Sequence, residues 1–226
     1  MAGFVFENDA YEPEVNIKVI GVGGGGGNAL NCMAASGAVT DIEYIAINTD
    51  ASALRSSKAT TKIQIGAKLT RGRGAGNKPD VGERSAQENK DEIAAALKDA
   101  DMIFITAGMG GGTGTGAAPI VAQIAKEMEI LTVAVVTKPF VFEREQKMLQ
   151  AERGISELKK YVDSLIVIPN EKLLVGLERP LTMRESFSLA DDILKTGVKS
   201  ISDLIVDEGF INLDFADVST IMKGAG

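Results

Sequence analysis

The chain has 226 residues, with 24 Lys plus Arg against 31 Asp plus Glu and a net charge of −7, which fits a soluble globular protein with a sizeable core. It has no His and a single Cys, so imidazole catalysis, His metal sites and an internal disulfide are excluded, and a reducing compartment is expected. The acidic balance argues against nucleic-acid binding, and the apolar runs are too short to insert into a membrane, so we expect a cytoplasmic protein.

Strands and helices alternate along the chain. Residues 1–14 are acidic, lack a signal pattern and are expected to form a disordered extension. Apolar β-branched runs then predict strands at 16–22, 42–48, 62–65, 101–107, 130–137 and 164–168, and helical periodicity predicts helices at 28–35, 81–97, 117–127, 143–161 and 182–204. This alternation predicts an α/β fold: a Rossmann-like, three-layer parallel sheet with helices on both faces.

Glycine is concentrated in three short windows. Residues 21–27, 72–76 and 108–116 hold 15 of the 25 glycines. The first and third windows each lie between a predicted strand and a predicted helix, so we interpret them as strand–turn–helix junctions rather than linkers. Such a junction offers free backbone N–H groups and the positive end of a helix dipole, which bind phosphate.

The two junctions together favour a nucleoside triphosphate. The first fits the G-x-G-x-x-G pattern of dinucleotide-binding proteins, and Asp50 after the second strand would suit the ribose-binding acid of that scheme. The second loop is longer than a turn requires, and two loops on neighbouring strands indicate a ligand with more phosphate. Neither loop contains Lys, so we expect amides, the Thr113 and Thr115 hydroxyls and Mg²⁺ to meet the phosphate charge. The plainer alternative is two structural turns.

With these loops in this order, the sequence resembles the tubulin/FtsZ family. Gly110 to Gly116 (GGGTGTG) is similar to the family signature, and further matches extend the resemblance over about residues 16–222: Asn48-Thr49-Asp50, Thr137-Lys138-Pro139-Phe140, Ile168-Pro169-Asn170 and residues 212–217. The resemblance implies a GTP-dependent, filament-forming cytoskeletal GTPase that builds the bacterial division ring. It also implies a GTP-binding domain at 15–206, followed at 207–226 by a catalytic loop and the start of a segment leading to a second domain.

The resemblance implies a set of residues that bind GTP or GDP. Mg²⁺ would be held through the nucleotide rather than by protein side chains. The residues near the γ-phosphate would be Ala75, Gly76 and Asn77. The phosphates would lie against Gly24, Gly25, Gly26, Gly27, Asn28, Gly111, Gly112, Thr113, Gly114 and Thr115. Glu143 and Lys147 would reach the ribose, Asn170 and Asp191 would read guanine, and Phe187 would stack on it.

Two details of this set depart from the family or stay open. The family commonly has Gly and Arg where this chain has Arg144 and Lys147, and Lys lacks the planar fork of Arg. Asp191 and Asp192 are adjacent, so which of them faces the base is open. For both acids, the plainer interpretation is a charge on a helix surface.

With no His in the chain, carboxylates are the candidates to orient the attacking water. From spacing alone, Asp214 and Asp217 are better explained as carboxylates at a helix N-terminus than as catalytic residues. The resemblance implies instead that Asn212, Asp214 and Asp217 act in trans, in the nucleotide site of the next copy of a head-to-tail filament. Family members continue into a second domain and a partner-binding tail. We therefore expect this chain to bind nucleotide but to hydrolyse slowly and polymerise poorly, with other division proteins bound chiefly outside it.

Two other function classes stay open. A Rossmann oxidoreductase would need only one glycine loop, and a structural module could hold nucleotide without hydrolysing it.

Overall fold

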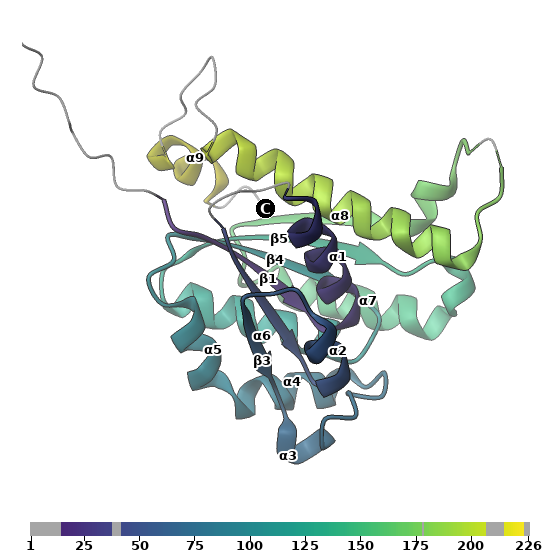
Figure 1. The fold of residues 1–226 in the computed structure, drawn as a ribbon, viewed down its shortest axis with the longest axis horizontal. Coiled ribbons are helices and arrows are strands. Elements are labelled where there is room, and N and C mark those ends of the chain that lie inside the picture. Colours follow the sequence, from purple (N-terminus) through teal and green to yellow (C-terminus); the bar gives the residue numbers. More distant parts are fainter. Residues whose placement is uncertain (1–14, 38–41, 178, 207–214, 224–226) are drawn as a thin grey trace, which may run out of the picture.

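The computed structural model describes residues 15–37, 42–177, 179–206 and 215–223. Six strands form one parallel sheet in the order β3 (Thr61–Gln64), β2 (Glu43–Asn48), β1 (Ile17–Val22), β4 (Met102–Gly108), β5 (Leu131–Lys138) and β6 (Ser164–Pro169) (Figure 1). The predicted α/β architecture is thereby confirmed. The strand order reverses between β1 and β4, and in such sheets ligands bind at that point, beyond the carboxyl ends of the strands.

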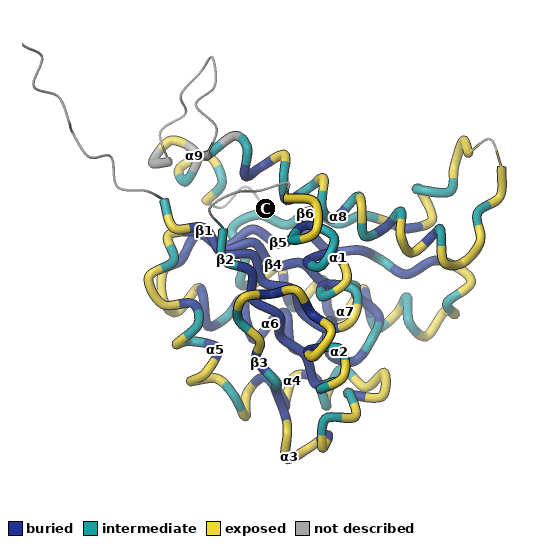
Figure 2. The backbone as a smooth tube through the Cα atoms, viewed as in Figure 1, coloured by how far each residue is buried: buried dark blue, intermediate teal, exposed yellow. Residues whose placement is uncertain are grey.

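Helices cover both faces of the sheet and enclose two apolar cores. One core lies under α4 (Pro79–Glu88), α5 (Lys90–Leu97), α6 (Thr113–Glu127) and α7 (Glu145–Leu158), and the other under α1 (Gly23–Ser36), α2 (Ala51–Ser56) and α8 (Met183–Val206). Along β1 the side chains alternate, so that Ile20 and Val22 enter the first core while Ile17 and Val19 enter the second. Figure 2 shows the sheet as the buried centre of the molecule.

The start of the first helix differs from the prediction. α1 begins at Gly23, directly after β1, so the first glycine window forms the opening turns of the helix and is not a turn before it. Glycine is a poor helix former, but close packing requires it here: a Cβ at Gly26 would lie 2.1 Å from the Thr106 carbonyl oxygen. In the same way α6 begins at Thr113, four residues before its predicted start.

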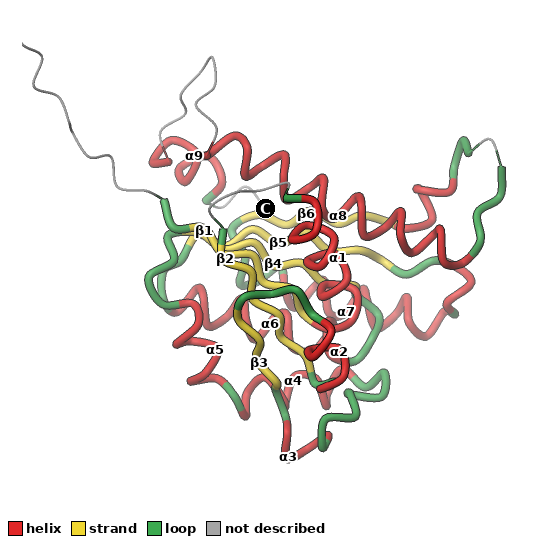
Figure 3. Tube along the Cα trace, in the orientation of Figure 1, coloured by secondary structure: helices red, strands yellow, loops and turns green. Residues whose placement is uncertain are grey.

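Two long predicted helices are each interrupted (Figure 3). The helix expected at 81–97 ends at Glu88 and resumes as α5 at Lys90, because the Asn89 side chain at the break accepts a hydrogen bond of 2.9 Å from Gly66 N. The helix expected from residue 143 begins as a short 3-10 turn, η1 (Val141–Glu143), and resumes as α7 after Arg144. The short elements α3 (Ala67–Thr70), η2 (Asn170–Leu174) and α9 (Phe215–Met222) complete the described fold.

Candidate functional site

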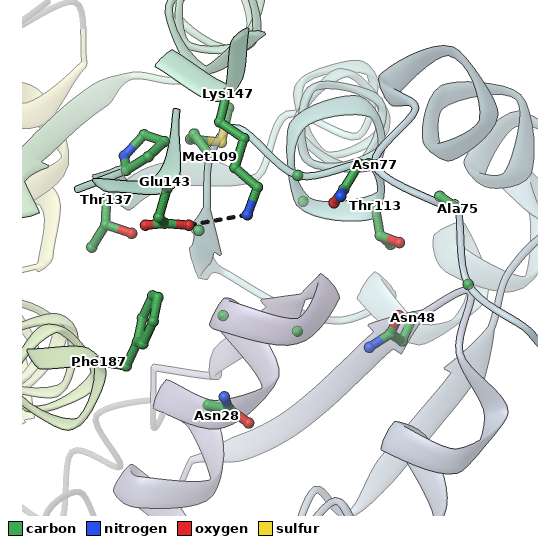
Figure 4. A pocket seen from close by; sticks show the side chains of 18 of the residues that line it. Asn28, Asn48, Ala75, Asn77, Met109, Thr113, Thr137, Glu143, Lys147 and Phe187 are labelled. Carbon is green, nitrogen blue, oxygen red and sulfur yellow. Dashed lines mark hydrogen bonds and ion pairs between the residues drawn. The ribbon is translucent and has the colours of Figure 1, made fainter. Parts of the chain in front are cut away.

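A pocket of about 480 Å³ lies at the strand-order reversal, beyond the carboxyl ends of β1 and β4 (Figure 4). The N-termini of α1 and α6 line it, together with the loop after α3, the start of α7, η2 and α8. Fifteen of the residues predicted to bind nucleotide line this one pocket: Gly24, Gly25, Asn28, Ala75, Gly76, Asn77, Gly111, Gly112, Thr113, Gly114, Glu143, Lys147, Asn170, Phe187 and Asp191.

At one end of the pocket, two glycine-rich helix N-termini lie in backbone contact. A Cβ at Gly23 in α1 would come within 2.7 Å of Gly114 N in α6, and one at Gly25 within 3.1 Å of the Cα atom of Gly108, the last residue of β4. No side chain fits between α1 and α6, so both helices bring their free N–H groups and the positive ends of their dipoles to the same place. This arrangement suits a polyphosphate.

A buried side chain that does not line the pocket holds the turn between β4 and α6 in its conformation. Gly110 has φ +101°, where an L side chain is strained, and its N–H donates to Thr115 Oγ1 at 2.8 Å. Thr115 is buried and does not line the pocket. Gly26 and Gly27 do not line it either, since Gly26 is packed against β4. These three residues, predicted to bind phosphate, therefore lie outside the pocket.

The loop of the middle glycine window forms one wall. Gly74 to Asn77 line the pocket, and the loop is tied to the sheet by a hydrogen bond of 3.3 Å from Gly74 N to Thr49 O. Beyond the loop, α4 packs so closely on the α6 turn that a Cβ at Gly82 would lie 2.3 Å from Gly112 O. The wall thus lies next to the glycine-rich N-terminus of α6.

The middle of the pocket holds a paired cation. Lys147 Nζ lies 3.0 Å from Glu143 Oε2, while Glu143 Oε1 accepts a hydrogen bond of 3.0 Å from Phe140 N (Figure 4). Arg144, between them in the chain, has φ +87° and ψ 148°, a conformation that is costly for any residue with a side chain. Arg144, which stands where the family commonly has Gly, therefore lies at a position of backbone strain.

The other end of the pocket is built from side chains. Asn170 is buried, and its Oδ1 has no hydrogen-bond partner in the described part of the chain. The Phe187 ring points into the pocket and stands edge-on to Phe140 and Phe142, with interplanar angles of 88° and 89°. An unsatisfied buried acceptor beside an aromatic ring fits a planar base that carries hydrogen-bond donors.

The structure separates the two adjacent acids. Asp191 lines the pocket, whereas Asp192 forms an ion pair of 2.9 Å with Lys195. Burial, together with the neighbouring charge of Asp192, raises the pKa of Asp191 to about 6. Because its ionised form is poorly solvated, Asp191 is the acid that would gain most from a ligand donor.

The predicted catalytic residues do not lie in this chain's own pocket, as far as the structure describes them. Asp217 is exposed in the first turn of α9 and does not line it. Asn212 and Asp214 fall outside the described residues. Within the described ranges, no three His, Cys, Asp or Glu side chains cluster as metal ligands, and no helix has the length and apolar character needed to cross a bilayer.

Some residues of the pocket were not among the predicted site residues. Asn48 and Thr137 line it but were quoted only within motifs that resemble the family. Asn48 ends β2 and Thr137 lies near the end of β5, so the rule that ligands bind at strand ends could have assigned both to the site. Phe140 and Phe142, which stack on each other at 4.9 Å and contact Phe187, lie far from Phe187 in the sequence, and no local pattern links them to it.

Comparison with known proteins agrees with this geometry. Residues 16–177 match the model of the Tubulin/FtsZ family, GTPase domain. A cell division protein FtsZ from Buchnera aphidicola subsp. Baizongia pistaciae (strain Bp) is 54% identical over 221 residues, which is 96% of this chain and 57% of that protein. An empty FtsZ dimer from M. jannaschii has a TM-score of 0.91 and 47% identity, with 95% of this chain and 62% of that chain covered. CetZ2 from Haloferax volcanii, in a GTPγS-bound protofilament, shares the fold with a TM-score of 0.74 at 22% identity, over 86% of this chain and 61% of that one.

The chain therefore spans about three fifths of the length of these relatives. The family model nevertheless covers most of it, and the matched region includes both glycine-rich helix N-termini. The chain belongs to the tubulin/FtsZ family.

Proposed function

We propose that this chain binds GTP and GDP in the described pocket and hydrolyses GTP, as part of a protein that polymerises head to tail into the bacterial division ring. One observation carries the proposal: two helix N-termini suited to phosphate and three side chains suited to a base line a single pocket. Residues 15–206 are the proposed GTP-binding domain, residues 207–226 contain the proposed catalytic loop, and the proposed location is the cytoplasm at the division site.

The proposed base recognition follows from donor and acceptor chemistry. Guanine presents its N1–H and amino group on one edge, and the Asp191 carboxylate can accept from both. Asn170 Oδ1 is a further acceptor that lacks a partner in the described structure, and Phe187 offers a ring face for stacking. Adenine has no matching pair of donors, so this end favours guanine.

We propose that Mg²⁺ reaches the site on the phosphate oxygens, where it would neutralise charge on the transferred phosphoryl group. Two of the carboxylates that line the pocket already have partners. Asp50 Oδ1 accepts hydrogen bonds from Ser52 N at 2.7 Å and Ala53 N at 3.2 Å, and Glu143 is paired with Lys147. Water is therefore expected to supply the remaining metal ligands.

Hydrolysis is proposed to need two copies. Asn212, Asp214 and Asp217 would enter the pocket of the next copy and orient the attacking water there. The exposed position of Asp217, away from its own pocket, supports this, as does the description of the M. jannaschii relative as a dimer. A repeated head-to-tail contact of this kind does not close, so it produces filaments, to which other division proteins would bind.

Nucleotide extraction followed by chromatography tests the proposed ligand. Guanine nucleotides are expected in the purified protein. A nicotinamide or flavin cofactor in their place would revive the oxidoreductase alternative, against which family membership argues.

A mixing experiment tests the shared site. Asp214→Asn/Asp217→Asn and Asp191→Asn chains are each expected to release little phosphate alone. Mixed, they are expected to recover activity, because half of the mixed contacts join an intact pocket to an intact loop. Release that rises linearly with the concentration of the unsubstituted chain, without recovery on mixing, would show that each copy acts alone. Bound guanine nucleotide with no release at any concentration would favour the nucleotide-holding module.

A further inference from the structure

One segment of this acidic chain is strongly basic. Between Ala51 and Pro79 there are seven Lys and Arg and no Asp or Glu, whereas the rest of the chain has 17 against 31. All seven are exposed, and in the described structure none forms an ion pair, although eight other Lys and Arg do. They are Arg55, Lys58, Lys62, Lys68, Arg71, Arg73 and Lys78.

The pocket beside this segment has the opposite charge. Its charged lining consists of Lys147 and the three acids Asp50, Glu143 and Asp191. Because Lys147 is paired with Glu143 at 3.0 Å, the charges of Asp50 and Asp191 remain uncompensated within the lining. The helix N-termini attract anions only over about one helical turn. A polyphosphate approaching from solvent therefore meets a lining that repels it.

Two of the seven cations are next to the pocket lining in the chain. Arg73 and Lys78 directly flank Gly74–Asn77, the run that lines it, and the backbones of Arg73 and Asp50 pair in an isolated bridge. Lys62 belongs to the same segment but lies at the amino end of β3, away from the carboxyl ends of the strands where the pocket is. Lys98, outside the segment, is likewise exposed and lies just before the amino end of β4.

We propose that Arg73 and Lys78 act as an electrostatic collector that speeds the capture of nucleoside polyphosphates by the pocket. This inference rests on the proposed function. The two long side chains attract phosphate through solvent before contact, and the backbone amides of α1 and α6 then hold it. The collector thus raises the association rate and leaves the dissociation rate almost unchanged. The two cations respond only to charge, so the selection of guanine depends on the side chains at the base end of the pocket.

Stopped-flow binding of a fluorescent GTP analogue tests the collector. Arg73→Gln/Lys78→Gln removes the two charges that flank the lining run, and Lys62→Gln/Lys98→Gln is the matched control, because it removes the same charge from exposed positions at the amino ends of β3 and β4. At low ionic strength the association rate constant is expected to fall about tenfold in the first variant. In the control it is expected to fall less than about twofold, because these positions are screened from the pocket.

Salt and ligand charge distinguish attraction from a damaged loop. The difference between the variants is expected to shrink as ionic strength rises, and to be smaller for a fluorescent monophosphate than for the triphosphate. Equal rates for the two variants, or a loss that persists at high salt, would overturn the collector while leaving the proposed function intact. Failure of the unsubstituted chain to bind the triphosphate would overturn the proposed function, and the collector with it.

Discussion

The two ends of the pocket differ in which part of the chain forms their surface. The proposed phosphate end is made of backbone, where α1 and α6 approach so closely that side chains would collide. The proposed base end is made of side chains, in which Asn170, Phe187 and Asp191 each present a particular group. The phosphate end therefore depends on the absence of side chains and is coupled to folding, whereas the base end depends on side-chain identity and is separable from it.

Gly26→Ala has the largest expected effect and tests whether the phosphate end is coupled to folding. Its Cβ would lie 2.1 Å from the Thr106 carbonyl oxygen, so we expect the free energy of unfolding to fall by about 3 kcal/mol. Gly24→Ala is the control, since a Cβ there meets no atom within 4 Å, and it should change stability by less than about 1 kcal/mol. Urea unfolding of both variants measures this. Equal stabilities would mean that the phosphate end is not coupled to folding.

Asp191→Asn tests whether nucleotide binding at the base end can be lost without loss of folding stability. Loss of a carboxylate that accepts from two guanine donors is expected to weaken GTP binding about 100-fold, since hydrogen bonds to charged groups contribute about 1.5–3 kcal/mol each. Unfolding should show no loss of stability. Asp192→Asn serves as the control, because Asp192 is paired with Lys195 and does not line the pocket. If calorimetry showed the greater loss for Asp192→Asn, the assignment of the two acids would be reversed.

The raised pKa of Asp191 predicts a pH dependence that the Asp191→Asn variant lacks. In the nucleotide-free pocket this pKa is about 6, and only the ionised carboxylate can accept from both guanine donors. The affinity relative to the Asp191→Asn variant, a ratio from which titration of the nucleotide phosphate cancels, should be constant above pH 7. It should fall by about tenfold at pH 5, where one carboxylate in ten is ionised. The Asp191→Asn variant should lose this component. For folding the sign is opposite: the carboxyl of the unfolded chain, with an ordinary pKa of 3.8, releases its proton first, so Asp191 destabilises the nucleotide-free fold progressively as pH rises from 4 to 6.

The smallest expected effect lies between the two ends. Arg144 has φ +87°, so Arg144→Gly should relieve backbone strain and raise the free energy of unfolding by about 1 kcal/mol. Arg144→Ala keeps a Cβ and should give no such gain. Thermal unfolding of the two variants compares them directly, and equal shifts would show that lost side-chain contacts, not strain, set the stability at this position.

The sequence predicted the sheet because its buried strands are continuous apolar runs, and the glycine windows after two of those strands predicted the two helix N-termini that line the pocket. The side chains at the other end of the pocket were implied only by the family resemblance. It misplaced the start of α1 because close packing, which no local pattern reveals, makes helical residues of Gly23–Gly27. It missed α2 and α3, whose lengths of six and four residues are too short to show helical periodicity. The contact of Phe187 with Phe140 and Phe142 depends on α8 and the η1 turn, which are far apart in the sequence, meeting in space.

The strand order has a consequence for unwanted association. The outer strands of the described sheet are β3 and β6, and exposed outer strands invite pairing with another molecule. β3 has only four residues and carries the exposed Lys62, while β6 ends at Pro169, which has no N–H to donate. Both borders of the sheet thus discourage edge-to-edge pairing and amyloid-like stacking with a second molecule.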